Sequence, residues 1–528
     1  MSVQPHAHPV LTCREAQTLE REVLVDEAAE WLAMRRAGEG IARQVIEDYL
    51  EIRPVPEHLR VLALVGKGHN GGDALLACAQ LLADYPRAKV DLVLATRVEA
   101  LRSLTARALE QLEGRVQIHF IAEQSDVVLL TQMLLKFGGD AGFHICLDGL
   151  LGMSFKPPLR EPVAALIAAV NAFERIDLRA SVDLPSGAGD EVREGARRFD
   201  ADFTYATGVV KRPLLGGIAD CGRIRYVDLG FFDTTAGKAV VTEEVVLTDA
   251  VLDPVRRLRA AAADKRTYGH LFIVGGSAFM AGALLMTVKA AIRSGVGLVT
   301  AFAPASVASS FAAQVPEAIW IPWPENFHGM LNPRAMSLLL SRIHHASALV
   351  VGPGMGLGRS TELITQHIVK RVDLPILLDA DALSVRGMEV VQKRRSDYAR
   401  IVVTPHMGEF MRIGKLSAPN NSLEAMLGFS QVYHVVTVLK GSNTRISDGE
   451  TVMYSTLGGA VLSRGGSGDM LSGLIGGMMA QRDVPVPLAV ARGVTLHGLA
   501  AQRLARDKGQ VAVNTTQILD YLPEVLRA

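Results

Sequence analysis

The chain has 528 residues, of which 49% are hydrophobic and 21% charged, with 55 basic and 55 acidic side chains. One hydrophobic core stops growing at roughly 250 to 300 residues, so this length predicts at least two domains, and the composition excludes a disordered chain. The balanced charge excludes the positive field that gathers nucleic acid or an acidic membrane surface, so we expect a small-molecule enzyme without such partners.

The first half of the chain alternates short apolar runs with longer helical patterns. It opens with an amphipathic, charge-rich segment over residues 12–50, which predicts helix. The alternation that follows is typical of a mostly parallel α/β sheet. The predicted strands are residues 61–65, 90–96, 116–122, 143–148, 180–184 and 203–207.

A second alternating series follows residues 231–262, where motifs become sparse. The uncharged stretch 271–288 carries Gly275, Gly276 and Gly282, and it indicates a buried strand, turn and helix, not a membrane span. The predicted strands are residues 270–276, 297–303, 348–354, 375–381, 400–406 and 435–441. We predict two α/β domains, each a three-layer αβα unit, over residues 1–235 and 236–528.

A glycine-rich turn after the first predicted strand is the first candidate site. Gly66, Gly68 and Gly71 satisfy GxGxxG, in which glycines allow close backbone approach and a helix N-terminus faces an anion. Asp73 argues against a bound pyrophosphate, because its carboxylate would repel one, so it either caps the helix or faces another ligand. The next strand ends in Thr96, where a hydride-transfer domain needs a carboxylate. The turn is therefore either purely structural or a different kind of ligand site.

Two further strand ends carry acidic residues. Asp148 ends one apolar run, and Asp183 and Ser186 belong to the SVDLPSG segment after the next. Carboxyl ends of parallel strands share one edge of a sheet, so we expect these side chains to meet Asn70 there. Asn70, Asp148 and Ser186 offer the oxygen ligands that hard cations take, which leaves Asp183 to act as acid or base.

These motifs resemble the NAD(P)HX epimerase domain, whose pattern is NNGGD, an aspartate before a glycine-rich loop, and VDxPSG, over about residues 12–230. The resemblance implies a Rossmann-like domain that interconverts the R and S hydrates of NADH and NADPH. It implies K⁺ at Asn70, Asp148 and Ser186, with Asp183 at the reacting part of the substrate. The implied substrate-binding residues are His69, Asn70, Gly71, Gly72 and Asp73 in one loop and Gly152, Met153, Ser154, Phe155, Lys156, Pro157 and Pro158 in another.

The sequence departs from that family pattern at several positions, one of which is SGAGDE from Ser186, where SGLDAD is commoner. His69 stands where asparagine is usual, Ala74 replaces a glycine, and Arg35 takes the glutamate position of an MExAG-like segment. They motivate an alternative in which the first domain is an inactive ligand-binding or protein-docking module.

The segment RGGSGDMLSGLIGG, from Arg464, is the second candidate site. A glycine-rich turn leads into an apolar helix whose first amides can hold an anion, and Asp469 lies beside them. Phosphoryl transfer needs such a positive cradle and a carboxylate near the accepting hydroxyl. The sequence contains no GxxxxGK[ST] motif, which argues against an ordinary phosphate-binding loop.

This segment resembles the signature of the ribokinase-like superfamily, and its neighbours narrow the resemblance to the ADP- or ATP-dependent NAD(P)HX dehydratases over about residues 250–525. Those neighbours are GHLFIVGGSAFMAGA from Gly269, AIRSGVGLVT from Ala291, VGPGMG from Val351, LLDADAL from Leu377, TPHMGEF from Thr404 and VLKGSNT from Val438. One departure is TLGGAVLSRGG, where the family often has asparagine in NxGMATGG-like text.

The resemblance implies that ADP, or else ATP, with Mg²⁺ phosphorylates the C6 hydroxyl of the hydrate, and that elimination of phosphate restores the ring. Asp469 is implied to activate that hydroxyl. The other implied contacts are Ala283, Gly354 and His406 to the hydrated nucleotide, and Lys440, Gly441, Ser442, Asn443, Thr444 and Gly468 to the donor's adenylate. The order epimerase then dehydratase resembles the branch that uses ADP.

Simpler interpretations stay open for several of these residues. His406 is otherwise a loop histidine, and Lys440 a surface residue at a hairpin turn. The ribokinase-like signature alone also permits a kinase that phosphorylates a vitamin precursor or a sugar.

Features outside the two sites bear on location. Cys13, Cys78, Cys146 and Cys221 form no CxxC pair, which indicates neither a disulfide framework nor a zinc site. Residues 1–10 do not have the pattern of a secretion signal. We expect a cytoplasmic protein, and a homo-oligomer.

Overall fold

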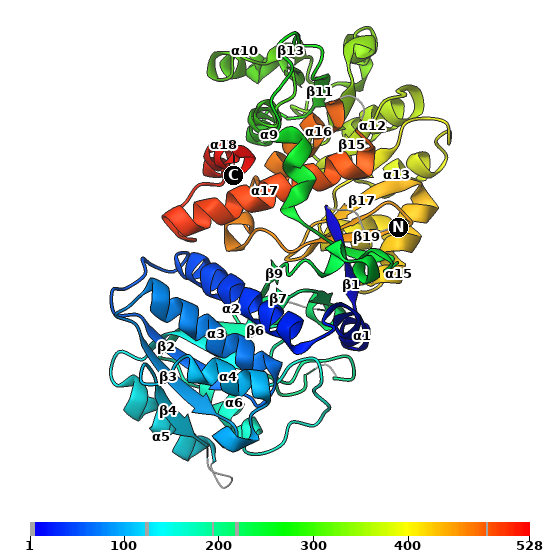
Figure 1. Cartoon of the computed structure of the whole chain (residues 1–528). Coiled ribbons are helices and arrows are strands. Elements are labelled where there is room, and N and C mark those ends of the chain that lie inside the picture. The colour runs from blue at the N-terminus through cyan, green and yellow to red at the C-terminus, as the bar shows by residue number, and fades with distance from the viewer. Residues whose placement is uncertain (1–5, 122–125, 193–194, 217–220, 482–483, 528) are drawn as a thin grey trace.

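Two α/β sheets, one dominated by each half of the chain, organise the fold in this computed structural model (Figure 1). The structure describes residues 6–121, 126–192, 195–216, 221–481 and 484–527. The N-terminal unit forms the lower part of Figure 1 and the C-terminal unit the upper part. The predicted α/β class with two units is confirmed.

The first sheet has seven strands, all parallel to their neighbours, in the order β4-β3-β2-β5-β6-β7-β9. Its strands are β2 (Arg60–Val65), β3 (Lys89–Leu94), β4 (Gln117–Phe120), β5 (Phe143–Gly149), β6 (Ile176–Val182), β7 (Phe203–Thr207) and β9 (Arg223–Val227). The six strands expected in this half are confirmed with slightly different bounds; residue 122, at the end of one of them, lies outside the described residues.

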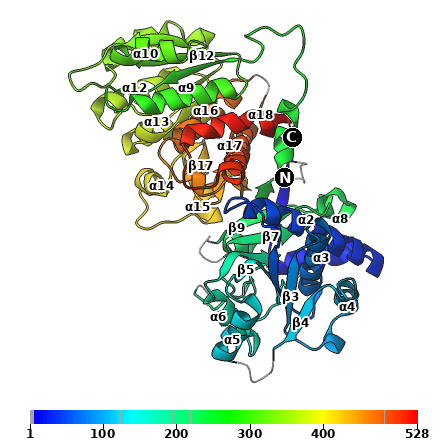
Figure 2. The ribbon, with the colours of Figure 1, turned by 90° about the vertical axis from the view of Figure 1, so that its left-hand side faces the viewer.

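Helices cover both faces of this sheet. The layer on one face contains α2 (Glu27–Tyr49), α3 (His69–Asp84) and α4 (Ser103–Glu110), and the layer on the other contains α5 (Val127–Gly138) and α6 (Val163–Asn171). Figure 2 separates the layers, with α5 and α6 to the left of the strands and α3 and α4 to the right. The predicted helical opening is two helices, α1 (Cys13–Val23) and α2, because Asp26 caps α2 by accepting the Ala29 N–H at 2.8 Å.

The second sheet has twelve strands, in the order β13-β12-β11-β14-β15-β16-β17-β18-β19-β10-β1-β8. The first seven in this order are parallel. They are β13 (Ile319–Trp323), β12 (Leu298–Pro304), β11 (His270–Val274), β14 (Ala348–Val351), β15 (Ile376–Leu378), β16 (Ile401–Val403) and β17 (Val435–Leu439), followed by β18 (Thr444–Ser447), β19 (Val452–Ser455) and β10 (Glu244–Leu247).

The last two strands of this sheet come from the N-terminal part of the chain. They are β1 (Ala7–Leu11), antiparallel to β10, and β8 (Val210–Lys211), parallel to β1. The edge of β10 is therefore covered by backbone from before residue 235. This sheet therefore contains strands from both sides of the predicted domain boundary between residues 235 and 236. The boundary itself stays a prediction.

One helical layer of the second unit includes the helix that the RGGSGDMLSGLIGG segment forms. It contains α9 (Ala281–Arg293), α10 (Ala305–Gln314), α16 (Ser467–Ala480), α17 (Val486–Lys508) and α18 (Leu522–Arg527). The opposite layer contains α11 (Ser337–Leu340), α12 (Arg359–Arg371), α13 (Val385–Gln392), α14 (Met407–Gly414) and α15 (Leu423–Tyr433). A short helix, α8 (Thr235–Lys238), follows β9.

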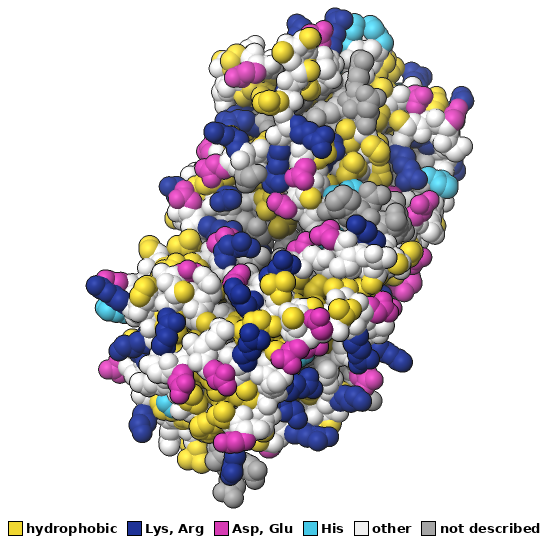
Figure 3. Space-filling view, in the orientation of Figure 1, with side chains coloured by type: hydrophobic (Ala, Val, Ile, Leu, Met, Phe, Trp, Pro, Cys, Tyr) yellow, Lys and Arg dark blue, Asp and Glu magenta, His cyan; other side chains and the backbone are white. Residues whose placement is uncertain are grey.

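Surface and core agree with the composition. On the face drawn in Figure 3, basic and acidic side chains are interspersed. The four cysteines are buried. Residues 271–288 form β11, a turn and most of α9, as expected, and within the described ranges no helix is long and apolar enough to cross a membrane.

Candidate active sites

Asp148, at the carboxyl end of β5, is a buried carboxylate that neutral groups surround. It accepts hydrogen bonds from the Ser186 N–H at 2.7 Å, the Ser186 hydroxyl at 2.5 Å and the Ser181 hydroxyl at 3.2 Å. Burial raises the pKa of Asp148 to about 6, against the opposing effect of these hydrogen bonds. A carboxylate in this position favours a bound cation.

Asn70 belongs to the same hydrogen-bonded group. Its Nδ2 donates to the Leu151 carbonyl at 2.9 Å, and the Leu151 N–H donates to the Ser186 hydroxyl oxygen at 2.9 Å. The structure thus brings Asn70, Asp148 and Ser186 together at one sheet edge. Their donor set, one carboxylate with hydroxyl and amide oxygens, fits a hard cation of low charge.

Asp183 lies beside this group, after β6, and is tied to Lys211 of β8. Its Oδ1 accepts hydrogen bonds from Lys211 Nζ and, at 3.0 Å, from the Thr207 hydroxyl. Lys211 is fully buried. Asp183 adopts φ 66°, a backbone conformation that residues other than glycine rarely take. Sequence reasoning missed Lys211; its one available signal was a lysine inside the apolar run GVVKRPLL.

Two further acids surround the Asp183–Lys211 pair. Helix α3 starts at His69 with Gly68 as its N-cap, so Asp73 lies inside the helix, and the interpretation of Asp73 as a cap is wrong. Burial, and next the charge of Asp183, raise the pKa of Asp73 well above its usual value. Burial likewise raises the pKa of Glu20, from α1, to about 7. Acids with raised pKa values beside a buried ion pair indicate proton chemistry.

The glycine-rich turn is shaped partly by packing. A Cβ at Gly66 would lie 1.9 Å from the Leu150 carbonyl oxygen, and one at Gly72 would lie 2.6 Å from Met34 Sδ, whereas Gly68 faces open space. A Cβ at Gly71 would lie 2.1 Å from the Gly66 carbonyl oxygen. Close backbone approach therefore explains Gly66 and Gly71, and Gly68 alone leaves room for a ligand.

The two predicted loops meet at Gly152, where an added Cβ would lie 3.4 Å from Asn70 Cβ. His69 Nε2 is 3.7 Å from a Glu30 carboxylate oxygen, and Gln17 Nε2 donates to the Ser154 hydroxyl at 3.3 Å. In the second loop, the Phe155 N–H donates to the Gly152 carbonyl, Met153 is half-buried, and Lys156, Pro157 and Pro158 are exposed. Arg35 is exposed and pairs with Glu39, one helical turn away.

The second site is a pocket of about 830 Å³ at the carboxyl ends of β15, β16 and β17. It contains most of the predicted dehydratase residues. His406, Lys440, Gly441, Ser442, Asn443, Thr444, Gly468 and Asp469 line it.

Asp469 lies in the first turn of α16, which begins at Ser467 after Gly466 in a left-handed conformation (φ 87°). The unpaired amides of that turn and the positive end of the helix favour an anion beside the carboxylate. Burial, and next the charge of Asp379, raise the pKa of Asp469 to about 6. The side chain is thus a carboxylate at neutral pH and basic enough to take a proton.

Asp379, which follows β15, holds Lys440 in the pocket. It accepts hydrogen bonds from Lys440 Nζ at 2.9 Å, the Thr404 hydroxyl at 2.7 Å and the Ser472 hydroxyl at 2.7 Å. Burial lowers the pKa of Lys440, but Asp379 and other acids outweigh this, so the pKa is raised and the lysine stays charged. Lys440 is therefore not a free surface residue. Asp379 was missed, although LLDADAL contains it.

His406 and the two small residues expected to touch substrate have different surroundings. His406 caps α14 by accepting the Glu409 N–H at 3.2 Å, and its ring is exposed to the pocket. Ala283 and Gly354 lie together, because a Cβ at Gly354 would be 3.0 Å from Ala283 Cβ. These two are not among the described residues that line the Asp469 pocket.

Comparison with known proteins covers both units. A family model described as NAD(P)H-hydrate dehydratase matches residues 271–524, and one described as YjeF-related protein N-terminus matches residues 32–213. The solved ADP/ATP-dependent NAD(P)H-hydrate dehydratase from Bacillus subtilis, co-crystallised with ATP/Mg²⁺, is 27% identical, with a TM-score of 0.43, over 52% of this chain and 95% of that one.

Curated relatives span nearly the whole chain. The bifunctional NAD(P)H-hydrate repair enzyme Nnr of Moorella thermoacetica is 32% identical over 485 residues, 89% of this chain and 87% of the relative. The protein of the same description from Salinibacter ruber is 30% identical over 535 residues, 98% of this chain and 96% of the relative. The chain belongs to the family of bifunctional NAD(P)H-hydrate repair enzymes.

Proposed function

We propose that the C-terminal unit dehydrates S-NAD(P)HX with ADP as phosphoryl donor, and that Asp469 is its base. Asp469 takes the proton of the C6 hydroxyl, whose oxygen attacks the terminal phosphorus of ADP and releases AMP. Phosphate then leaves C6 with its C–O bond electrons, and loss of a ring proton restores the reduced nicotinamide. The products of ADP and the hydrate are AMP, phosphate and NAD(P)H, so the atoms balance.

The single observation that carries this proposal is a carboxylate of raised pKa at the start of α16, in one pocket with Lys440. The amides of α16 face the transferred group, and Lys440 places a cation beside it. Glu409 lines the same pocket with a carboxylate, the ligand type of Mg²⁺, and would hold a Mg²⁺ ion carried by the nucleotide, whereas Asp379 is already engaged by three hydrogen bonds. That ion neutralises donor phosphate charge when bound.

The direct test uses the full chain with purified S-NADHX. Addition of ADP should regenerate the absorbance of reduced nicotinamide with one AMP and one phosphate per NADH. A stable phosphoester product, or turnover with ATP alone, would instead indicate a kinase of the ribokinase-like kind or a different donor. The relatives that span both units do not favour such a kinase.

The pH dependence of dehydration follows from Asp469. Only the carboxylate accepts the hydroxyl proton, so the rate should rise with pH through about 6 and level off above it. Initial rates from pH 4.5 to 8.5 at saturating ADP measure this. Asp381 is one of the charges that raise the pKa of Asp469, so Asp381→Asn should move the midpoint to lower pH. A rate that is flat between pH 5 and 7 in both proteins would contradict the assignment.

In the N-terminal unit, we propose that Asp183 is the acid–base group that interconverts R- and S-NAD(P)HX at C6. Lys211 fixes its carboxylate, and Asp73 and Glu20 supply further proton-exchanging groups. The loops at residues 69–73 and 152–158 hold the nucleotide beside Asp183. Asn70, Asp148 and Ser186 bind K⁺, which balances the buried Asp148 charge and fixes the loops that meet there.

Potassium binding is expected to stabilise the protein. A ligand at ten times its Kd adds about 1.4 kcal/mol, which corresponds to a rise of roughly 3 to 6 °C in Tm for a unit of this size. Thermal unfolding in KCl and in choline chloride of equal ionic strength measures the difference. Ser186→Ala should abolish it. Ser181→Ala, which removes a neighbouring hydrogen bond to Asp148, should keep it, and a shift preserved in Ser186→Ala would exclude Ser186 as a ligand.

The wider setting belongs to the same proposal. We propose a cytoplasmic homo-oligomer, with NADHX and NADPHX as its partners and with neither nucleic acid nor membrane. Light scattering coupled to size-exclusion chromatography tests the assembly state, and parallel turnover on the two hydrates tests the substrate range.

A further inference from the structure

The dehydratase pocket is also lined by two residues of the N-terminal unit, Arg223 and Ile224 of β9. We propose that Arg223 is a binding residue for the phosphates of the nucleotide donor, so that the C-terminal site is complete only when the N-terminal unit covers it. This inference rests on the proposed use of a nucleoside diphosphate in that pocket. It assigns Arg223 to donor binding, not to the chemistry at Asp469.

Arg223 lies directly over the glycine-rich segment that precedes α16. A Cβ at Gly459 would lie 2.4 Å from Arg223 Nη1, so the guanidinium occupies the space that a larger side chain at residue 459 would fill. Gly458, Gly459 and Arg464 line the same pocket. The side chain of Arg223 is 20% exposed, which leaves part of the guanidinium open to a ligand.

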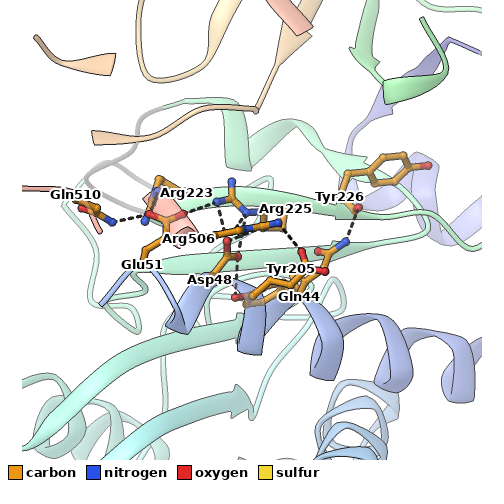
Figure 4. A network of polar contacts seen from close by, with 10 residues as sticks. Gln44, Asp48, Glu51, Tyr205, Arg223, Arg225, Tyr226, Arg506 and Gln510 are labelled. Atoms are coloured by element: carbon orange, nitrogen blue, oxygen red, sulfur yellow. Dashed lines mark hydrogen bonds and ion pairs between the residues drawn. The ribbon is translucent and has the colours of Figure 1, made fainter. Parts of the chain in front are cut away.

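The position of the guanidinium is fixed from behind. Nη1 donates to the Glu51 carboxylate at 2.8 Å, and the group lies 4.1 Å from the centre of the Phe203 ring. Glu51, whose side chain is fully buried, also accepts from Gln510 Nε2 at 2.5 Å (Figure 4). A guanidinium has five N–H donors, and the bond to Glu51 uses one of them. A preorganised arginine of this kind suits forked recognition of phosphate.

The charges around the pocket give Arg223 its role. Asp379, Glu409 and Asp469 are the described carboxylates that line it, whereas the described cations apart from Arg223 are Lys440 and Arg464. Without Arg223 the lining carries more negative than positive charge, and a nucleoside diphosphate is itself an anion. Loss of Arg223 should therefore weaken donor binding more than it affects the proton transfer.

The same network joins the two units, which provides a matched control. Arg506 of α17 donates to Glu47 at 2.5 Å and to Asp48 at 3.1 Å, both in α2, and Asp48 also pairs with Arg225 of β9 (Figure 4). Arg506 joins the units but is not among the described residues of the pocket lining. Arg506→Gln removes these contacts between the units but keeps Arg223, which Glu51 and Phe203 of its own unit hold in position.

The main experiment compares Arg223→Gln with Arg506→Gln in the full chain. Arg223→Gln should raise the KM for ADP, and the Kd for ADP measured by calorimetry, about tenfold, with kcat and the KM for NADHX changed less than about twofold. Arg506→Gln should lower Tm and leave the KM for ADP within about twofold. Equal effects of the two variants on KM, or none from Arg223→Gln, would overturn the assignment of Arg223.

A second substitution, at Gly459, tests the position of the Arg223 guanidinium. Gly459 is extended (φ 167°), so alanine fits its backbone, but the new Cβ would displace the flexible end of Arg223. Gly459→Ala should raise the KM for ADP severalfold in the wild type and have no further effect in Arg223→Gln. Additive effects would show that Gly459 acts without Arg223.

Further measurements separate the possible failures. If Arg223→Gln does not fold, Arg223→Lys keeps a cation beside Glu51 but loses the fork, and it should raise the KM for ADP by a smaller factor. If the wild type binds ADP but forms no NADH, the proposed dehydration is wrong, and the calorimetric comparison still tests Arg223. If the wild type forms NADH and all variants bind ADP equally, the inference alone is wrong.

Discussion

Asp469→Asn is expected to lower kcat for ADP-dependent dehydration by about 10²- to 10⁴-fold, the usual contribution of a general base. The amide keeps the size of the side chain but cannot take the C6 hydroxyl proton. Because Asp469 lies in the first turn of α16 and is partly exposed, the fold should tolerate the change. Stopped-flow or steady-state absorbance of regenerated NADH measures the loss.

Two controls test whether the loss of kcat arises in the chemical step. Asp381→Asn makes the same chemical change at a nearby acid that accepts the Gly356 N–H at 2.9 Å and is not part of the described pocket lining. At pH 8 its turnover should stay within about threefold of the wild type. Asp469→Asn should still bind ADP and should epimerise R- and S-NADHX at the wild-type rate. Unchanged dehydration by Asp469→Asn would remove the central residue of the mechanism.

Most strands of the parallel core could be predicted from the sequence. Runs such as VLALV and ASVDL are buried on both faces of a sheet, so they are continuously apolar and recognisable. Strand β9 was missed because its sequence, RIRYV, places two arginines in a strand. Those arginines are compatible with a sheet only because Asp48 and Glu51, far away in the sequence, neutralise them. No local pattern contains that pairing.

The site residues likewise divide into those that a local motif predicts and those that only the fold reveals. Asp148 lies at the end of a strand, Asp183 just after one and Asp469 in the first turn of a helix, and all three stand in recognisable motifs, so a single sequence places them there. Lys211 acts through its contact with Asp183, 28 positions away, and Asp379 through its contact with Lys440, 61 positions away. Their importance appears only when the sheet brings the partners together. Arg223 is a stronger case, since it reaches a pocket built by the other unit.

Asp183→Asn should abolish the interconversion of R- and S-NADHX and also destabilise the N-terminal unit. The substitution leaves Lys211, which is fully buried, without its carboxylate partner. Removing one member of a buried pair costs about 3 to 5 kcal/mol, so Tm should fall together with epimerase activity. Pure S-NADHX should still be dehydrated at the wild-type rate below the new Tm, whereas the R-NADHX in a mixture of both should remain unconverted.

A double variant separates the chemistry of Asp183 from its part in the fold. Replacing a buried pair by groups without charge is often neutral for stability, so Asp183→Asn combined with Lys211→Met should recover most of the lost Tm. Epimerisation should stay absent, because methionine restores packing but supplies no acid or base. Chiral separation of the two hydrates over time measures the rate, and thermal unfolding measures the recovery. If the double variant regained epimerase activity as it regained stability, Asp183 would serve the fold alone, and Asp73 or Glu20 would have to carry the proton.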